Sequence, residues 1–394
     1  MAAAVAIREA ALAGLASEER PAAIKARRVR IIAALYALHG PSHRLNFREL
    51  GGQPTKQGGQ TPNAPKSTRT STLPEEAHVP VKPRSLAIGV ATYIPGLRNF
   101  TGRKTGGTVS ARYCYSVWLR HLCMMYWHGL PTAFETVAEL GPGDSLGVGL
   151  AAILSGAERY VALDAVRYAD STRNLEILED LIVLFRNRAP IPDYVEFPLI
   201  QPPLSSYAFP SEVLTAARLE AALDPARLEA IRAAVAHPGA NPRDGGLVCY
   251  SAPWTAGMID DAAVDLVFSQ GVLQFVHDLR GVYTEMAGWL KPRGIMSHEI
   301  PFQSLGITAK WNGHWSCSDA LWTLAVGRRR HATNREPHST HIALLQGAGC
   351  QVVTDERIVR PSGISRAQLA RRFRHLSDED LTTSSALIQA VKVA

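Results

Sequence analysis

Short apolar runs alternate along this chain with longer stretches in which apolar residues recur every three or four positions. The short runs predict strands at residues 136–140, 159–164, 246–251, 263–269, 294–300, 351–355 and 387–393. The helical periodicity predicts helices at 110–126, 145–155, 170–187, 280–290 and 338–347. Strands that alternate with helices favour parallel pairing with helices on both faces, and the last two strands are expected to form a hairpin. The pattern therefore predicts an α/β fold on a doubly wound, mostly parallel seven-stranded sheet.

Two stretches depart from this alternation. Residues 1–84 combine an amphipathic helical pattern with a tract rich in Gly, Pro, Ser, Thr and Lys, so we expect a helical, largely disordered N-terminal extension. Residues 85–394 are then the folded domain. Within it, residues 189–244 separate the second and third strands by more than an ordinary crossover needs, which predicts a lid-like insertion.

The positive charge lies almost entirely in the N-terminal extension. The chain carries a net charge of +7. Residues 1–84 hold thirteen Lys or Arg against six Asp or Glu, and the two signs balance over the remaining residues. A neutral domain lacks the basic face that binding to phosphates requires, which argues against nucleic acid as a partner.

The cysteines and histidines indicate the compartment and the absence of a metal centre. Five cysteines are scattered without a C-x-x-C pair, which predicts a reducing, cytoplasmic compartment rather than a disulfide framework. His331, His338 and His341 lack a carboxylate or Cys at ligand spacing, so no metal is predicted. No apolar run reaches the roughly 18 residues of a membrane span. The oligomeric state stays open.

The most specific local signal is the glycine-rich turn in Val137-Ala-Glu-Leu-Gly-Pro-Gly-Asp-Ser145. It follows a predicted strand and precedes a helix, where glycines admit a ligand close to the backbone and helix N–H groups attract oxygens. The carboxylate of Glu139 stands just before the turn. It would repel a pyrophosphate but suits a ligand that carries positive charge.

Four segments in order resemble the class I S-adenosylmethionine-dependent methyltransferases over roughly residues 134–300. They are the glycine turn, Val161-Ala-Leu-Asp164, the stretch 265–278, and Trp289-Leu-Lys-Pro-Arg-Gly-Ile-Met296. The resemblance implies a Rossmann-like methyltransferase fold and S-adenosyl-L-methionine as cofactor. It also implies a set of cofactor-binding residues: Glu139, Gly141, Gly143, Ser145, Asp164, Ala165, Ser269, Gln270 and Tyr113.

The chain departs from the family pattern at two places, which keeps other interpretations open. The third strand ends in Tyr250-Ser-Ala-Pro-Trp254, without the acid that commonly touches adenine, and Gln274-Phe275 replaces a frequent Glu-His. One alternative is a non-catalytic binding or partner subunit with the same fold. Another is a nicotinamide-dependent oxidoreductase, although Gly147 comes one residue late for the G-x-G-x-x-G pattern.

The acceptor is expected to be a small molecule or a glycan, methylated on a hydroxyl. A hydroxyl usually needs a general base, for which we consider His298 and Glu299 at the end of the predicted fifth strand, and His314 in the aromatic segment 311–315. Ligands of open α/β sheets lie beyond the carboxyl ends of the strands, where His298 and Glu299 are predicted to stand. The competing interpretation is that such a histidine is a hydrogen-bonded structural residue.

Overall fold

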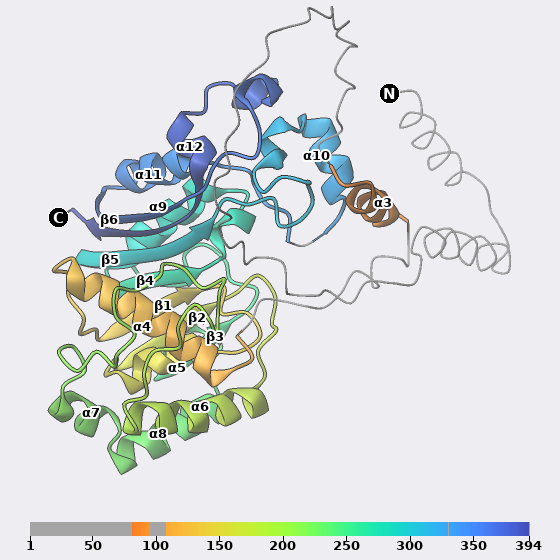
Figure 1. Cartoon of the computed structure of the whole chain (residues 1–394). Coiled ribbons are helices and arrows are strands. Elements are labelled where there is room, and N and C mark those ends of the chain that lie inside the picture. The colour runs from red at the N-terminus through yellow and green to blue at the C-terminus, as the bar shows by residue number, and fades with distance from the viewer. Residues whose placement is uncertain (1–80, 95–107, 330, 394) are drawn as a thin grey trace, which may run out of the picture. The chain divides into compact units, whose positions relative to one another are not determined.

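Seven strands form one sheet in the part of the chain that the structure describes, residues 81–94, 108–329 and 331–393 of a computed structural model. The strands are β1 (Thr136–Leu140), β2 (Arg159–Leu163), β3 (Val248–Ser251), β4 (Val264–Gln270), β5 (Leu290–Pro301), β6 (Cys350–Val359) and β7 (Thr383–Lys392). Their order in the sheet is β3-β2-β1-β4-β5-β7-β6 (Figure 1). The predicted Rossmann-like fold is confirmed.

Pairing directions divide the sheet into a parallel part and an antiparallel edge. Strands β3, β2, β1, β4 and β5 pair in parallel, whereas β7 pairs antiparallel with both β5 and β6. The predicted pairing of the two late strands is confirmed; β7 is the one that pairs with β5, and β6 forms the edge of the sheet. Strand order reverses at β1, between β2 and β4, and such a switch point leaves a crevice at the carboxyl ends of the strands.

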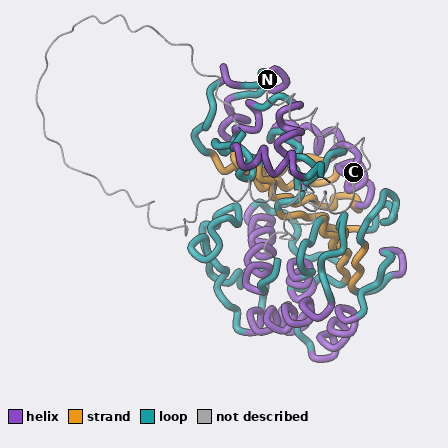
Figure 2. The backbone as a smooth tube through the Cα atoms, turned by 90° about the vertical axis from the view of Figure 1, so that its right-hand side faces the viewer, coloured by secondary structure: helices purple, strands orange, loops and turns teal. Residues whose placement is uncertain are grey.

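Helices cover both faces of the sheet, as Figures 1 and 2 show. One face carries α4 (Ala111–Trp127), α5 (Gly147–Leu154) and α6 (Ser171–Arg186); the other carries α9 (Leu279–Trp289) and α11 (His338–Gly347). A hydrophobic core lies on each face of the sheet, and successive strand residues belong to the two cores alternately. Val137 packs with α4 and α5, and Ala138 packs with α9. Strands buried on both faces read as continuous apolar runs, which explains the strength of that signal in the sequence.

The structure differs from the predicted elements around the fifth strand and in the segments that flank it. β5 begins at Leu290 rather than at 294, because α9 ends at Trp289 and the chain becomes extended at once, with an irregular register opposite Val264 and Leu266. Helices α3 (Pro83–Ala91), α10 (Asp319–Val326) and α12 (Asp378–Thr382) were not predicted. α3 packs on α10, and a side chain at Gly89 would collide with the carbonyl oxygen of Leu324 at 2.2 Å. Such short helices depend on this packing rather than on their own periodicity.

The insertion at 189–244 contains α7 (Ala216–Ala222) and α8 (Pro225–Ala236), which begin at the capping side chains of Thr215 and Asp224. Both helices pack on the face that carries α5 and α6. The start of the insertion reaches α4 instead, where Glu196 pairs with Arg112 and Phe197 meets the ring of Tyr113 edge-on. The lid function stays a prediction.

Five short 3-10 helices complete the described elements: η2 (Pro242–Asp244), η3 (Leu273–Phe275), η4 (Gly313–Ser316), η5 (Arg366–Gln368) and η6 (Arg371–Phe373). Of the predicted N-terminal extension, residues 1–84, the part up to residue 80 lies outside the described residues. No helix within the described ranges is long and apolar enough to cross a membrane.

Candidate active site

A cavity of about 680 Å³ lies at the carboxyl ends of β1, β2 and β4, where the strand order reverses. Its volume is typical of pockets that hold one small ligand or cofactor. Seven of the predicted site residues line it: Tyr113, Glu139, Gly141, Gly143, Asp164, Ala165 and Gln270. The fold therefore brings together residues that are up to 157 positions apart in the chain, Tyr113 on α4 and Gln270 on β4.

The glycine turn forms the floor of the cavity in a conformation that other residues rarely adopt. Gly141 has φ of 71° and Gly143 has φ of 77°. A Cβ on Gly141 would stand 2.6 Å from Cγ2 of Val272, another residue of the cavity wall. The amide of Gly141 donates to the carbonyl of Leu163 at 2.7 Å and ties the turn to β2. These glycines serve the backbone path and the open space above it.

Glu139 is a buried carboxyl group at the end of β1. Its exposed fraction is 2 %, and burial raises its pKa to about 8 although the hydroxyl of Tyr160 and the backbone N–H of Gly149 donate to it. A carboxyl held in this way favours a cation, because a neighbouring positive charge stabilises the charged form. A side chain on Gly149 would overlap the ring of Tyr160, with 1.9 Å between that Cβ and the ring carbon Cζ. Tyr160 and Gly149 were missed at the sequence level, because nothing local marks them as partners of Glu139.

Asp164 follows β2 and faces the glycine turn. Its Oδ2 accepts from the amide of Gly143 at 3.3 Å and its Oδ1 from the amide of Val166 at 3.4 Å. Burial raises the pKa of Asp164, and the nearby His331 and these backbone donors lower it. The carbonyl of Asp164 accepts from the amide of Trp254, which brings that indole to the cavity beside the acid.

Gln270 and Glu299 form the far side of the site at the ends of β4 and β5. The two residues are paired in register, and the Gln270 amide donates to Oε2 of Glu299 at 3.2 Å. Gln270 and Gly271 line the cavity, whereas Glu299 does not; a Cβ on Gly271 would stand 3.9 Å from Oε2 of Glu299, so this carboxyl lies directly behind the glycine. Burial raises the pKa of Glu299 to about 8. Burial raises the pKa of the Tyr113 hydroxyl most, and the nearby carboxyl groups of Glu299 and Glu139 raise it further.

Besides Glu299, four predicted site residues are not among those that line the cavity: Ser145, Ser269, His298 and His314. His298 lies next to Glu299 on β5, so its side chain points to the opposite face, where Nδ1 bonds to Ser269 at 2.9 Å. His314 is buried against Trp315, with 4.5 Å between the ring centroids. Burial lowers the pKa of both histidines to about 3. Ser145 is buried and donates its hydroxyl to the carbonyl of Thr108. Their functional roles stay predictions, and the geometry favours a structural role for each.

Three further lining residues were not predicted as site residues: Phe275, at a position where the chain departs from the family pattern, and Thr108 and His331, from segments that carry no recognisable motif. The rings of Phe275 and His331 meet edge-on at 5.3 Å, although 56 positions separate them in the chain. Thr108 accepts from the amide of Ser145 and so holds the start of the glycine turn. Only the fold brings them to this place. Within the described ranges, no group of three or more His, Cys, Asp or Glu is arranged to hold a metal ion.

A family model described as a methyltransferase domain matches residues 219–297. The match begins within α7 and spans α8, β3, β4, α9 and most of β5. It stops short of the glycine turn, from which the insertion separates it in the sequence. No curated protein matches the chain.

Solved structures of similar fold are distant in sequence. A putative S-adenosylmethionine-dependent methyltransferase of Listeria monocytogenes is 15 % identical, with a TM-score of 0.33, and the match covers 71 % of this chain and 98 % of that one. A putative sarcosine dimethylglycine methyltransferase of Galdieria sulphuraria is 12 % identical, with a TM-score of 0.37 and coverage of 70 % and 85 %. A phosphoethanolamine N-methyltransferase of Haemonchus contortus is 12 % identical, with a TM-score of 0.37 and coverage of 76 % and 61 %. At this distance the substrates of those proteins say nothing about this chain.

Proposed function

Because the chain carries a class I S-adenosylmethionine-dependent methyltransferase domain, we propose that it methylates a hydroxyl group of a small-molecule or glycan acceptor. The proposal is supported by two carboxyl groups that line one cavity at strand ends, Glu139 and Asp164, and by a third, Glu299, which lies behind the lining residue Gly271 and pairs in register with Gln270. Among the described residues that line this cavity there is no Lys or Arg. Such a lining suits a cationic cofactor and an uncharged acceptor better than a phosphate or a nucleic acid.

The cofactor is S-adenosyl-L-methionine, and the residues of the cavity fit it. Glu139, buried with a raised pKa, suits the ammonium of the methionine part. Asp164, fixed by two backbone amides, suits the ribose hydroxyls, and Trp254 beside it offers a flat apolar face for adenine in place of an acid. When bound, the cofactor would supply a methyl group on a positively charged sulfur; a nucleophile would attack the methyl carbon in line, and the sulfur would leave as a neutral sulfide.

The chain's own contribution to the chemistry is to orient the acceptor and to remove its proton. We assign the role of general base, which accepts the proton of the acceptor hydroxyl, to Glu299. Its pKa of about 8 lies near the pH at which a general base works best. Gly271 leaves room for an acceptor hydroxyl to approach that carboxylate. Tyr113, Phe275 and Val272 supply the apolar walls that exclude water.

A cytoplasmic location accompanies this proposal. All five cysteines are buried and free, as in proteins of reducing compartments. Size-exclusion chromatography with light scattering would determine the oligomeric state.

Removing either cofactor carboxylate is expected to weaken binding of S-adenosylmethionine. Glu139→Ala and Asp164→Ala should each cost about 1–3 kcal/mol, the usual worth of a hydrogen bond to a charged group. Calorimetric titration measures the loss. Asp170→Ala, which removes an acid that caps α6 after the same strand, is the matched control and should leave the affinity unchanged. Unchanged affinity in both site variants would contradict the assignment.

The affinity for S-adenosylmethionine is expected to rise with pH up to about 8. Glu139 is largely protonated below its pKa of about 8, and the ammonium binds only the carboxylate, so binding must release a proton there. The dissociation constant should therefore fall by about tenfold per pH unit between pH 6 and 7.5 and level off above 8. Glu139→Gln should lose this slope, whereas Glu299→Gln should keep it. A slope that survives in Glu139→Gln would assign the proton to another group.

A turnover assay separates the proposal from its alternatives. The purified chain with S-adenosylmethionine and a panel of alcohols, sugars and amines should produce S-adenosylhomocysteine only with hydroxyl acceptors. Tight cofactor binding without turnover on any of them would favour the non-catalytic partner subunit. Binding of NADH in place of S-adenosylmethionine would favour the oxidoreductase.

A further inference from the structure

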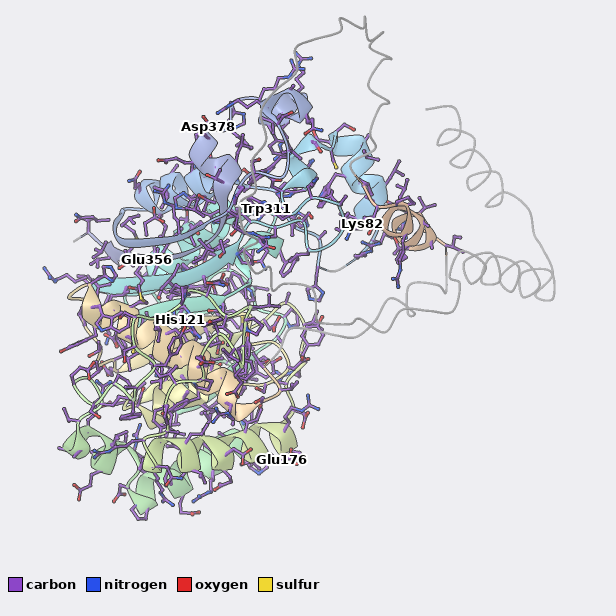
Figure 3. The ribbon with its side chains drawn as sticks, in the orientation of Figure 1. Lys82, His121, Glu176, Trp311, Glu356 and Asp378 are labelled. Atoms are coloured by element: carbon purple, nitrogen blue, oxygen red, sulfur yellow. The ribbon has the colours of Figure 1, made fainter. Side chains whose placement is uncertain are left out.

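A continuous line of buried polar side chains crosses the otherwise apolar layer between α4 and the sheet and ends at the active site. It runs from Gln389 on β7 through Ser297 on β5 and His121 on α4 to Gln270 and Glu299. Gln389, Ser297 and His121 are each at most 1 % exposed. Figure 3 labels His121, which lies between α4 and the strands. Only Gln270 and Glu299 belong to the site described above.

The direction of the hydrogen bonds along this line is determined at its β7 end. The amide nitrogen of Gln389 lies 3.2 Å from the carbonyl oxygen of His121, an atom that can only accept. The same nitrogen donates to the hydroxyl of Ser297 at 3.0 Å. That hydroxyl therefore keeps its own proton free to donate to Nδ1 of His121 at 2.7 Å.

The imidazole passes this direction on to Gln270. Burial lowers the pKa of His121 to about 4, so the ring is neutral and carries one proton. Because Nδ1 accepts from Ser297, the proton is on Nε2, which donates to Oε1 of Gln270 at 3.1 Å. The amide of Gln270 then has its NH₂ group toward Glu299, at 3.2 Å from Oε2. Every donor in the line points toward the carboxyl group.

We infer that His121 is a positioning residue that orients the Gln270 amide as a donor and so holds Glu299 as a proton acceptor. The inference rests on the base role proposed for Glu299. A reversed Gln270 amide would offer Glu299 a carbonyl oxygen, which a protonated carboxyl would bind better than a carboxylate does. The line thus works against the burial that favours the protonated form, and it links the antiparallel edge of the sheet to the reacting end of the site.

Infrared titration of the Glu299 carboxyl tests the inference without an acceptor. The C=O band of the protonated group should titrate with a midpoint near pH 8 in the wild-type protein and be absent in Glu299→Gln. The backbone N–H of Gly271 and the side-chain amide of Gln270 on β4 act on the Glu299 carboxyl, Tyr113 on α4 interacts with both Glu299 and Glu139, and Leu387 pairs with Glu299 in register from β7. Glu139→Gln separates the band of the second carboxyl with a similar pKa.

His121→Phe should raise the Glu299 midpoint by about one pH unit, because it keeps a flat ring but loses both hydrogen bonds. His121→Gln keeps an N–H near the place of Nε2 and should restore the wild-type midpoint. Ser297→Ala, a milder change, should also raise the Glu299 midpoint. If His121→Phe does not fold, this variant alone tests the positioning role of His121. Trp118→Phe changes the ring beside His121 that also packs on Phe268 and should leave the midpoint unchanged.

The outcomes separate this inference from the proposed function. An unchanged midpoint in His121→Phe, or in Ser297→Ala where only that variant folds, would overturn the positioning role of His121. A missing Glu299 band near pH 8 in the wild-type protein would overturn the base role itself. A raised midpoint in His121→Phe that His121→Gln reverses, with binding of S-adenosylmethionine unchanged, is the result we expect.

Discussion

Glu299→Gln is expected to slow methyl transfer by about 10²–10⁴-fold, the usual contribution of a general base. The amide cannot take the proton from an acceptor hydroxyl, yet it keeps the size of the buried side chain and its place beside Gln270. The dissociation constant of S-adenosylmethionine should stay close to that of the wild-type protein, because Glu139 and Asp164 remain. Initial rates of S-adenosylhomocysteine formation on a hydroxyl acceptor measure the effect.

The pH profile makes this prediction more specific. A base with a pKa of about 8 is active when deprotonated, so the turnover number of the wild-type enzyme should rise with pH and level off above 8. Replacing His298 by Gln changes the neighbouring strand position on the other face and serves as the control. Equal loss of turnover in the two variants would contradict the assignment of the base to Glu299.

Gly149→Ala is expected to destabilise the protein by about 3 kcal/mol or more, at the upper end of what overpacking a core costs. The added Cβ would stand 1.9 Å from Cζ of Tyr160, and neither residue has space to move because both are buried in the core between α5 and the sheet. Displacement of the Tyr160 ring also removes a donor from Glu139. The substitution should therefore lower both the affinity for S-adenosylmethionine and the free energy of unfolding. Urea unfolding followed by circular dichroism measures the stability.

Gly347→Ala provides the matched control for that substitution. Gly347 ends α11, and a Cβ there would meet nothing within 4 Å. This alanine should leave the free energy of unfolding unchanged or raise it by up to about 1 kcal/mol, since alanine favours the helix over glycine. If Gly149→Ala were as stable as Gly347→Ala, the close contact of Gly149 with Tyr160 would not exist in solution.

The cofactor half of the site could be predicted from the sequence because its residues are local to strand ends. Glu139 and Asp164 each close an apolar strand, and the glycine turn follows Glu139 directly. Parallel strands bring such ends to one edge, so a linear pattern was enough to place them together. The same alternation predicted the mostly parallel sheet and the late hairpin, whereas the order of the strands is known only from the structure.

The acceptor half could not be predicted because it depends on which face each side chain takes. His298 and Glu299 are adjacent on β5, so at most one of them can face the cavity. Which of the two side chains faces the cavity cannot be told from the start of β5 at Leu290. It follows from the register of β5 with β4, which pairs Gln270 with Glu299. His121 and His331 reach the site through tertiary packing, for which no spacing in the sequence provides a signal.

Titration of S-adenosylmethionine into the wild-type protein and into a Glu139→Gln/Asp164→Asn double variant tests whether these two carboxyl groups hold the cofactor in the cavity. Both substitutions keep the shape of the side chains and remove only their charge. We expect the wild-type protein to bind S-adenosylmethionine at one site per chain and the double variant to lose most of that affinity. Absence of binding by the wild-type protein, or equal binding by the double variant, would contradict it.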